Sequence, residues 1–223
     1  MVLLALWLLL SFLMTFMYFI SIPGFFRALG LEPRTALLLS LLSILGSTVN
    51  IPIRRIRRPI TVQREAYSFW GIAYPVPLKS AEEITIAINL GGCVVPLAVS
   101  CYLIATRPHL WLWYLLDTAA TTAVSYATAR VIPGVGIAVP FFVPATVAGV
   151  IALALDLRQA ASVAYVAGTL GTLLGADLLH LRRAIHLGNA PVLSIGGAGT
   201  FDAIFVTGLT AVWIAYALAP TGG

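Results

Sequence analysis

The chain has 223 residues, of which 60% are hydrophobic and only 9% are charged. A soluble domain carries about 25% charged residues, so this composition excludes a protein that covers itself with a hydrated surface. The apolar stretches are long and continuous rather than alternating, which indicates transmembrane helices and not a β-barrel. We therefore predict a single membrane domain over residues 1–223, an all-α polytopic bundle of about seven spans.

Seven apolar segments of roughly spanning length follow one another along the chain. They lie near residues 1–22, 35–49, 83–105, 110–131, 135–155, 160–179 and 200–219. The only sizeable polar segment lies between the second and third, and its four prolines exclude one continuous helix. Its aromatic residues are typical of the membrane surface, so we expect a polar interfacial loop at about 50–82.

Lys and Arg are distributed unevenly between the two sides of the predicted bundle. Nine fall in the loops 50–82, 130–134 and 180–199, and four fall in the loops of the other side. The positive-inside rule then predicts a multi-pass protein of the cell membrane with its N-terminus in the cytoplasm and its C-terminus outside. Arginines at 54–58 beside apolar spans suit anionic lipid head groups, so the net charge of +5 does not imply nucleic acid.

Three of the eight acidic residues, Asp117, Asp177 and Asp202, lie inside the predicted spans or within a turn or two of them. An ionisable group at that depth costs at least about 2.5 kcal/mol on insertion scales, so each is a functional candidate. Asp117 lies beside a polar helix face made of Tyr114, Thr118, Thr121, Ser125 and Thr128. That face can either hydrogen-bond to neighbouring helices or line a cavity.

Asp177 and Asp202 lie at the two ends of a short polar loop. On the helix of Asp177, Gly168, Gly171 and Gly175 form a ridge that lets a neighbouring helix approach closely. At about 100° per residue, the carboxylate lies about 160° from Gly175 and faces a different helix or a cavity. Asp202 follows a glycine-rich segment able to adopt positive φ. The two spans therefore form an antiparallel hairpin that can bring both carboxylates together.

Two carboxylates in contact in a low-dielectric site cannot both ionise, so they share one proton. One can then take a proton from water while the other donates one to a carbonyl oxygen, as in aspartic proteases. We therefore predict that Asp177 and Asp202 are catalytic. The predicted substrate-binding residues are Gly196, Gly197, Gly199 and Thr200. The alternative is that each aspartate pairs with Thr, Ser or Arg and only fixes helix packing.

The residues around the two aspartates resemble the GxGD intramembrane aspartyl proteases, the presenilin and signal-peptide-peptidase group. The matching residues are Asp177, Gly197-Ala198-Gly199, Asp202 and Ile204-Phe205. Thr200 and Phe201 separate the second glycine from the aspartate where that group has no residue, and Ala176 replaces its tyrosine. The resemblance implies a membrane-embedded peptide hydrolase.

Over nearly its full length, the chain more closely resembles an uncharacterised membrane family of archaea and bacteria, DUF1614. The stretches that carry this resemblance are Asn89-Leu90-Gly91-Gly92, Gly175-Ala176-Asp177 and Gly196-Gly197-Ala198-Gly199-Thr200-Phe201-Asp202. The family name implies no activity.

A proton- or cation-coupled transporter or channel is the alternative function, with the same aspartates as ion sites. A hydrolase needs its two carboxyl groups within roughly 3–6 Å of each other or bridged by one water, whereas a transporter tolerates separated acids. Asp177, His180 and His186 are potential metal ligands, but no His pair at helical ligand spacing supports them, so we predict neither a metal nor a cofactor. The expected partners are membrane lipids and a transmembrane peptide substrate.

Overall fold

The computed structural model describes residues 20–67, 73–132, 136–187, 191–197 and 203–219, and most of them are helical. The N-terminal half contains a helix over 20–28, α2 (Pro33–Gly46), β1 (Asn50–Tyr67), β2 (Ala73–Asn89), the π-helix η1 (Leu90–Val94) and α3 (Val95–Thr106). The rest contains η2 (Pro108–Leu110), α4 (Trp111–Thr128), β3 (Arg130–Ile132), β4 (Gly136–Ala138), α5 (Phe142–Leu155), α6 (Ala160–Thr172), the π-helix η3 (Leu173–Leu178), α7 (Leu179–Leu187), β5 (Val192–Ile195) and α8 (Ala203–Leu218). The prediction of a mainly helical chain is confirmed, but all-α is wrong because five strands are present among the described residues.

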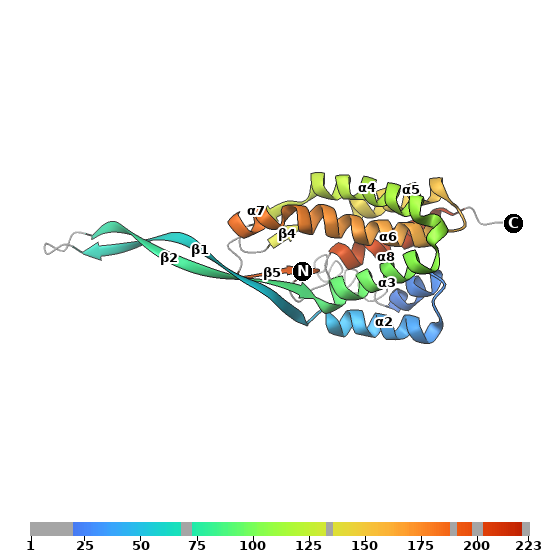
Figure 1. The fold of residues 1–223 in the computed structure, drawn as a ribbon, viewed down its shortest axis with the longest axis horizontal. Coiled ribbons are helices and arrows are strands. Elements are labelled where there is room, and N and C mark those ends of the chain that lie inside the picture. The colour runs from blue at the N-terminus through green and yellow to red at the C-terminus, as the bar shows by residue number, and fades with distance from the viewer. Residues whose placement is uncertain (1–19, 68–72, 133–135, 188–190, 198–202, 220–223) are drawn as a thin grey trace, which may run out of the picture.

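Helix α6 lies at the centre of the bundle, with α3, α4, α5 and α8 packed around it (Figure 1). Its sequence, AASVAYVAGTLGT, offers small side chains on every side, and eleven of its thirteen residues are buried. Small residues let neighbouring backbones approach closely all around a helix. Around α6, the largest fully buried side chains include Tyr165, Phe26 and Phe205.

Only one continuous helical stretch among the described residues is long and apolar enough to cross a membrane, Ala160–His186. Leu90–Thr106 and Pro108–Thr128 pass the same test together, but they are bent by 100° at their junction. The apolar helices α2, α5 and α8 have 14, 14 and 16 residues. This content is compatible with a membrane protein, but the prediction of about seven spans is not confirmed. Most of the predicted span 1–22 lies outside the described residues.

The polar segment predicted as an interfacial loop is instead a long antiparallel hairpin of β1 and β2, which projects from one end of the bundle (Figure 1). It also takes the first seven residues, 83–89, of the predicted third span. Prolines are tolerated in edge strands and at bulges. Pro52 lies at a bulge of the edge strand β1, and Pro75 and Pro77 lie where the ribbon has only two strands. The prolines thus exclude a helix without excluding strands.

The predicted loop 180–199 also contains regular structure, since α6 continues through η3 into α7 and β5 follows. Strand β5 adds to β2 in parallel, which gives the sheet order β1-β2-β5. At this end of the bundle, Ile84, Ala184 and Leu193 form a small separate core, with Val131 and Ile137 packed against it. We call the elements joined by this core the cap. The cap consists of the base of the hairpin (residues 50–57 and 83–89), α7, β3, β4 and β5.

Candidate functional site

Asp177 lies in the π-helical segment η3, where α6 leaves the bundle and enters the cap. π-helical segments are rare inside helices and occur often at functional sites. The Asp177 side chain is buried, and its Oδ2 accepts a hydrogen bond from the backbone N–H of Gly196, with an N–O distance of 3.2 Å. The carboxyl group therefore faces the turn after β5. This agrees with the predicted orientation of Asp177 away from the glycine ridge.

The glycine ridge itself contacts two helices rather than one. A Cβ added at Gly171 would lie 2.7 Å from Thr121 Cβ, and one at Gly175 would meet the backbone oxygen of Thr122. Both residues therefore pack against α4. Gly168 instead faces α8, where an added Cβ would lie 3.1 Å from the Cα of Gly208. The predicted close approach is confirmed, with the correction that the ridge contacts two helices, α4 and α8.

The turn after β5 presses against η1. Gly196 and Gly197 have φ values of +86° and +93°, a conformation that only glycine adopts without strain. A Cβ at Gly196 would also lie 2.7 Å from the backbone N of Cys93. On the other side of the contact, a Cβ at Gly92 would meet the carbonyl oxygen of Gly196. Two glycine-rich segments, far apart in the sequence, therefore meet backbone to backbone beside Asp177.

A small hydrophobic cluster joins the elements that flank both predicted catalytic residues. Leu173 from η3, Ile195 from β5, Ile204 from α8 and Cys93 from η1 form one buried group. Leu173 precedes Asp177 by four residues in the chain, and Ile204 is the second residue of α8. The start of α8 and the helix segment that carries Asp177 thus contribute to the same buried cluster.

Three of the predicted site residues, Gly199, Thr200 and Asp202, lie outside the described residues. The structure therefore gives no distance between the carboxyl groups of Asp177 and Asp202. Of the predicted substrate-binding residues, Gly196 and Gly197 lie in the turn against which the Asp177 carboxyl rests.

Asn89, which the sequence marked only by its part in the family resemblance, is a buried residue of this site. Its Nδ2 donates to the carbonyl oxygen of Ser47 at 2.6 Å and to Asn50 Oδ1 at 3.0 Å, and its Oδ1 accepts from Gly92 N at 2.8 Å. Asn50 Oδ1 also accepts from Ser194 Oγ at 2.6 Å. The side-chain amide of Asn89 thus links the end of α2, β1 and η1, and the Asn50 amide extends this link to β5. The available signal was an Asn two residues before Gly91-Gly92, a residue type whose side chain often bonds to nearby backbone groups.

The histidines do not assemble a metal site with Asp177 in the described part of the chain. No group of three His, Cys, Asp or Glu side chains there could hold an ion. His180 Nδ1 donates to the carbonyl oxygen of Gly175 at 3.1 Å, and its ring lies 4.8 Å from that of Tyr126. His186 is exposed on α7. The His180 ring thus packs the chain just after η3 against Tyr126 of α4.

Asp117 is fully buried on the face of α4 that packs against α6. Thr121 Oγ1 donates to Asp117 Oδ1 at 3.2 Å, and Oδ2 has no hydrogen-bond partner among the described residues. The hydroxyl groups of Thr118, Thr122 and Ser125 on the same helix also lack partners there. The polar face predicted on this helix is therefore buried and only partly satisfied.

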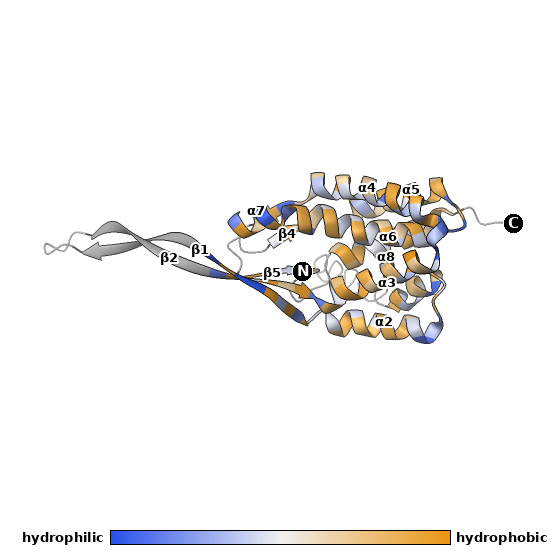
Figure 2. Cartoon of the chain, viewed as in Figure 1, coloured by the Kyte–Doolittle hydropathy of each residue, from blue (hydrophilic) through white to orange (hydrophobic). Residues whose placement is uncertain are grey.

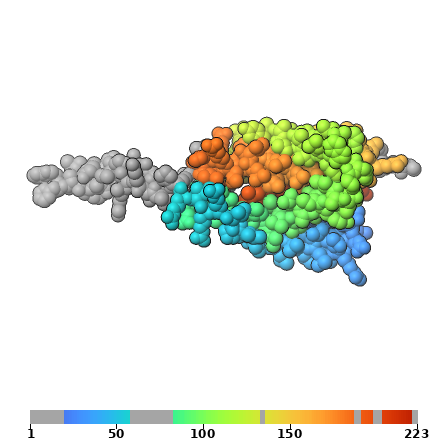
Figure 3. Space-filling model, in the orientation of Figure 1, coloured from blue at the N-terminus to red at the C-terminus, as the bar shows by residue number. Residues whose placement is uncertain are grey.

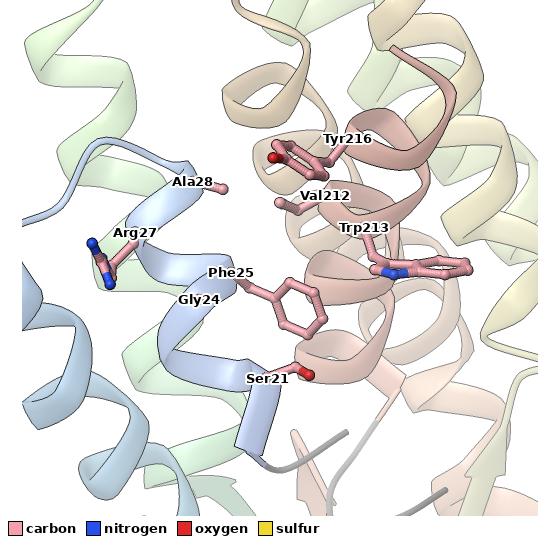
Figure 4. A pocket seen from close by; sticks show the side chains of 8 residues that line it. All are labelled: Ser21, Gly24, Phe25, Arg27, Ala28, Val212, Trp213 and Tyr216. Atoms are coloured by element: carbon pink, nitrogen blue, oxygen red, sulfur yellow. The ribbon is translucent and has the colours of Figure 1, made fainter. Parts of the chain in front are cut away.

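One hollow in the described structure is lined by neither Asp177 nor Asp117. It is a groove of about 630 Å³ between the helix over 20–28 and α8 (Figure 4). Phe25, Val212 and Tyr216 face it, whereas the Arg27 side chain points away from α8. None of its lining residues is a predicted site residue.

Comparison with known proteins gives one match. The family model described as "Protein of unknown function (DUF1614)" matches residues 44–214, which is more than half of the chain. No curated protein and no solved structure matches the chain. The resemblance to the GxGD proteases therefore gains no support from these comparisons. On the strength of the family match, this chain belongs to the DUF1614 family.

Proposed function

We propose that this protein is a membrane-embedded aspartyl hydrolase that cleaves peptide bonds, with Asp177 and Asp202 as its catalytic pair. The observation that carries the proposal is the contact between Asp177 and the turn that leads toward Asp202. Asp177 Oδ2 accepts a hydrogen bond from Gly196 N, six residues before Asp202. Leu173 of η3 and Ile204, two residues after Asp202, belong to one buried cluster, which supports the proposal.

In the proposed reaction, the two carboxyl groups share one proton. The charged carboxylate takes a proton from a water molecule, whose oxygen attacks the peptide carbonyl carbon. The neutral carboxyl group gives its proton to the carbonyl oxygen, which yields a gem-diol. The carboxyl group that took the proton from water then gives it to the nitrogen, one gem-diol hydroxyl returns its proton to the other carboxylate, and the C–N bond breaks to release acid and amine. Because Gly196 is packed against η1 on the side where a Cβ would lie, a substrate backbone beside Asp177 would contact this turn on another side.

The test is cleavage of a panel of transmembrane peptides by the purified protein. Asp177→Asn and Asp202→Asn should each abolish cleavage, and the double variant should be no worse, because the pair acts as a unit. Asp117→Asn is the matched control, since it removes a buried carboxyl group elsewhere in the bundle and should keep cleavage. Full activity in either single variant of the pair would refute the proposal.

A second function, a proton- or cation-coupled transporter or channel, is favoured by a separate observation. Asp117 is a buried acid with an unpartnered oxygen on a helix face rich in hydroxyl groups. Such acids mark ion and proton pathways in membrane proteins. In proteoliposomes, this function predicts ion or proton flux that Asp117→Asn abolishes, with no peptide cleavage by the wild type.

A further inference from the structure

The cap carries a dense group of exposed basic side chains. Its exposed arginines are Arg54, Arg55 and Arg57 on β1, Arg130 on β3, and Arg182 and Arg183 on α7. Among the described side chains of the cap, Glu83 is the only acid, and its Cα is paired with that of Arg57 across the hairpin. The described side chains of the cap thus carry six positive charges and one negative charge.

Packing holds these arginines at one end of the molecule. Ala184, between the α7 arginines and His186, is buried against Ile84 of β2 and Leu193 of β5. The base of β1 is paired with β2 through register partners such as Arg55 and Thr85. In Figure 3 the base of the hairpin, coloured cyan, lies beside α7, coloured deep orange. The basic residues therefore gather at one end of the molecule.

The opposite end of the bundle is more nearly balanced. Its exposed arginines are Arg27, Arg34 and Arg158, and they share that end with Glu32 and Asp156. A fourth arginine, Arg107, is occupied there by hydrogen bonds to Ser162 Oγ and to the carbonyl oxygen of Leu29. The charge of the described residues is therefore polarised along the bundle toward the cap.

Between the two ends, the helices consist mostly of apolar residues (Figure 2). The exposed large hydrophobic residues of the helices include Leu38, Leu41, Leu45, Leu115, Trp213 and Tyr216. A basic surface just beyond such an apolar belt lies at the level of lipid head groups when the belt is in a bilayer. Nucleic acid or a soluble acidic protein would not explain why the basic surface adjoins an apolar one.

We infer that the cap is a binding surface for anionic phospholipid head groups, which the six arginines contact at the membrane surface. Guanidinium groups bind phosphate through paired N–H donors. The inference rests on the membrane placement in the proposed function and not on its catalytic chemistry. Because η3 enters the cap directly after Asp177, lipids bound there would lie next to the proposed site.

The experiment uses the full chain purified in a neutral detergent, with phosphatidylglycerol or phosphatidylcholine of identical acyl chains added. Bound lipid is counted by native mass spectrometry, and thermal unfolding is followed in parallel. Phosphatidylglycerol should bind more tightly at low salt, and Arg182→Gln with Arg183→Gln should weaken it by at least about tenfold, given about 1 kcal/mol per basic residue at an anionic surface. Arg27→Gln with Arg34→Gln removes equal charge from the other end and should leave binding unchanged.

Three results would overturn the inference: equal binding of the two lipids, equal losses in the two paired variants, or equal stabilisation by inorganic phosphate. If the α7 pair does not fold, Arg54→Gln, Arg55→Gln and Arg57→Gln test the same surface on exposed hairpin positions. Failure of the proposed function looks different. A chain that stays monodisperse in water without detergent would refute membrane placement, whereas loss of lipid preference in a detergent-requiring protein refutes only this inference.

Discussion

The α4–α6 interface and the contact between η1 and the turn after β5 both depend on glycine, but in different ways. In the interface, Gly171 and Gly175 are helical and simply leave room for α4. In the contact beside Asp177, Gly196 has a positive φ and its N–H binds a carboxylate. The first arrangement serves packing. The second holds the backbone N–H of a left-handed glycine turn against an ionisable group, an arrangement that a residue with a side chain could adopt only with strain.

The largest expected effect tests the packing role. Gly171→Leu places a side chain where even a Cβ would lie 2.7 Å from Thr121, so the helices must separate. The free energy of unfolding should fall by about 3 kcal/mol or more. Gly24→Leu is the matched control, because an added Cβ there meets nothing within 4 Å. Unfolding in detergent checks both, and equal stability of the two variants would show that α4 and α6 are not in close contact.

A smaller effect is expected at the turn beside Asp177. Gly196→Ala adds both φ strain and a clash with Cys93, whereas Gly136→Ala at φ +124° adds strain with no neighbour within 4 Å. The first should cost about 2 kcal/mol more than the second. It should also abolish peptide cleavage at temperatures where the fold persists, which assays and melting curves on the same samples would separate. Cleavage that simply follows stability in both variants would assign Gly196 a packing role alone.

The sequence predicted much of the packing but little of the cap. A ridge of three glycines and an aspartate facing away from it follow from helical periodicity, and both are present. The four prolines of residues 50–82 exclude a helix, and for that reason a loop was predicted where the structure has the hairpin of β1 and β2. The alternation of Ile84, Ile86 and Ile88 was the available strand signal, since period two places them on one face. Because residues 83–89 are mostly apolar, they were assigned to the predicted span 83–105, and this alternation was not read as a strand.

The π-helical segments could not be predicted for a different reason. An α-helix and a π-helix of the same residues differ by small local energies, which contacts with distant segments decide. At η1 these contacts come from Ser47 and Gly196, which both lie far from η1 in the sequence. Likewise, a predicted loop gave no indication that β5 would pair with β2. For the candidate site, the residue types near Asp177 could be predicted from the sequence, but the contact that orients its carboxyl group could not.

The smallest expected changes in stability compare buried threonine hydroxyl groups with and without a hydrogen-bond partner among the described residues. Thr121→Val removes the hydrogen bond to Asp117 and should cost about 1 kcal/mol. Thr172→Val replaces a buried hydroxyl group that has no partner among the described residues, so stability should be unchanged or slightly higher. Thermal unfolding of the two variants checks this order. A larger loss for Thr172→Val would mean that its hydroxyl group binds water or an ion.

The approach of Asp177 to Asp202 is the central claim, and cross-linking measures it most directly. In a background of Cys93→Ser and Cys101→Ser, the pair Asp177→Cys and Asp202→Cys should form a disulfide or react with a short thiol-specific linker, since bridging requires Cα atoms within about 7 Å for a disulfide. A protease site engineered between the two positions would reveal the cross-link on a gel. The pair Asp117→Cys and Asp202→Cys, under the same conditions, should not react. If the 177–202 pair also stays uncrosslinked with both reagents while the protein remains folded, the shared-proton mechanism is wrong.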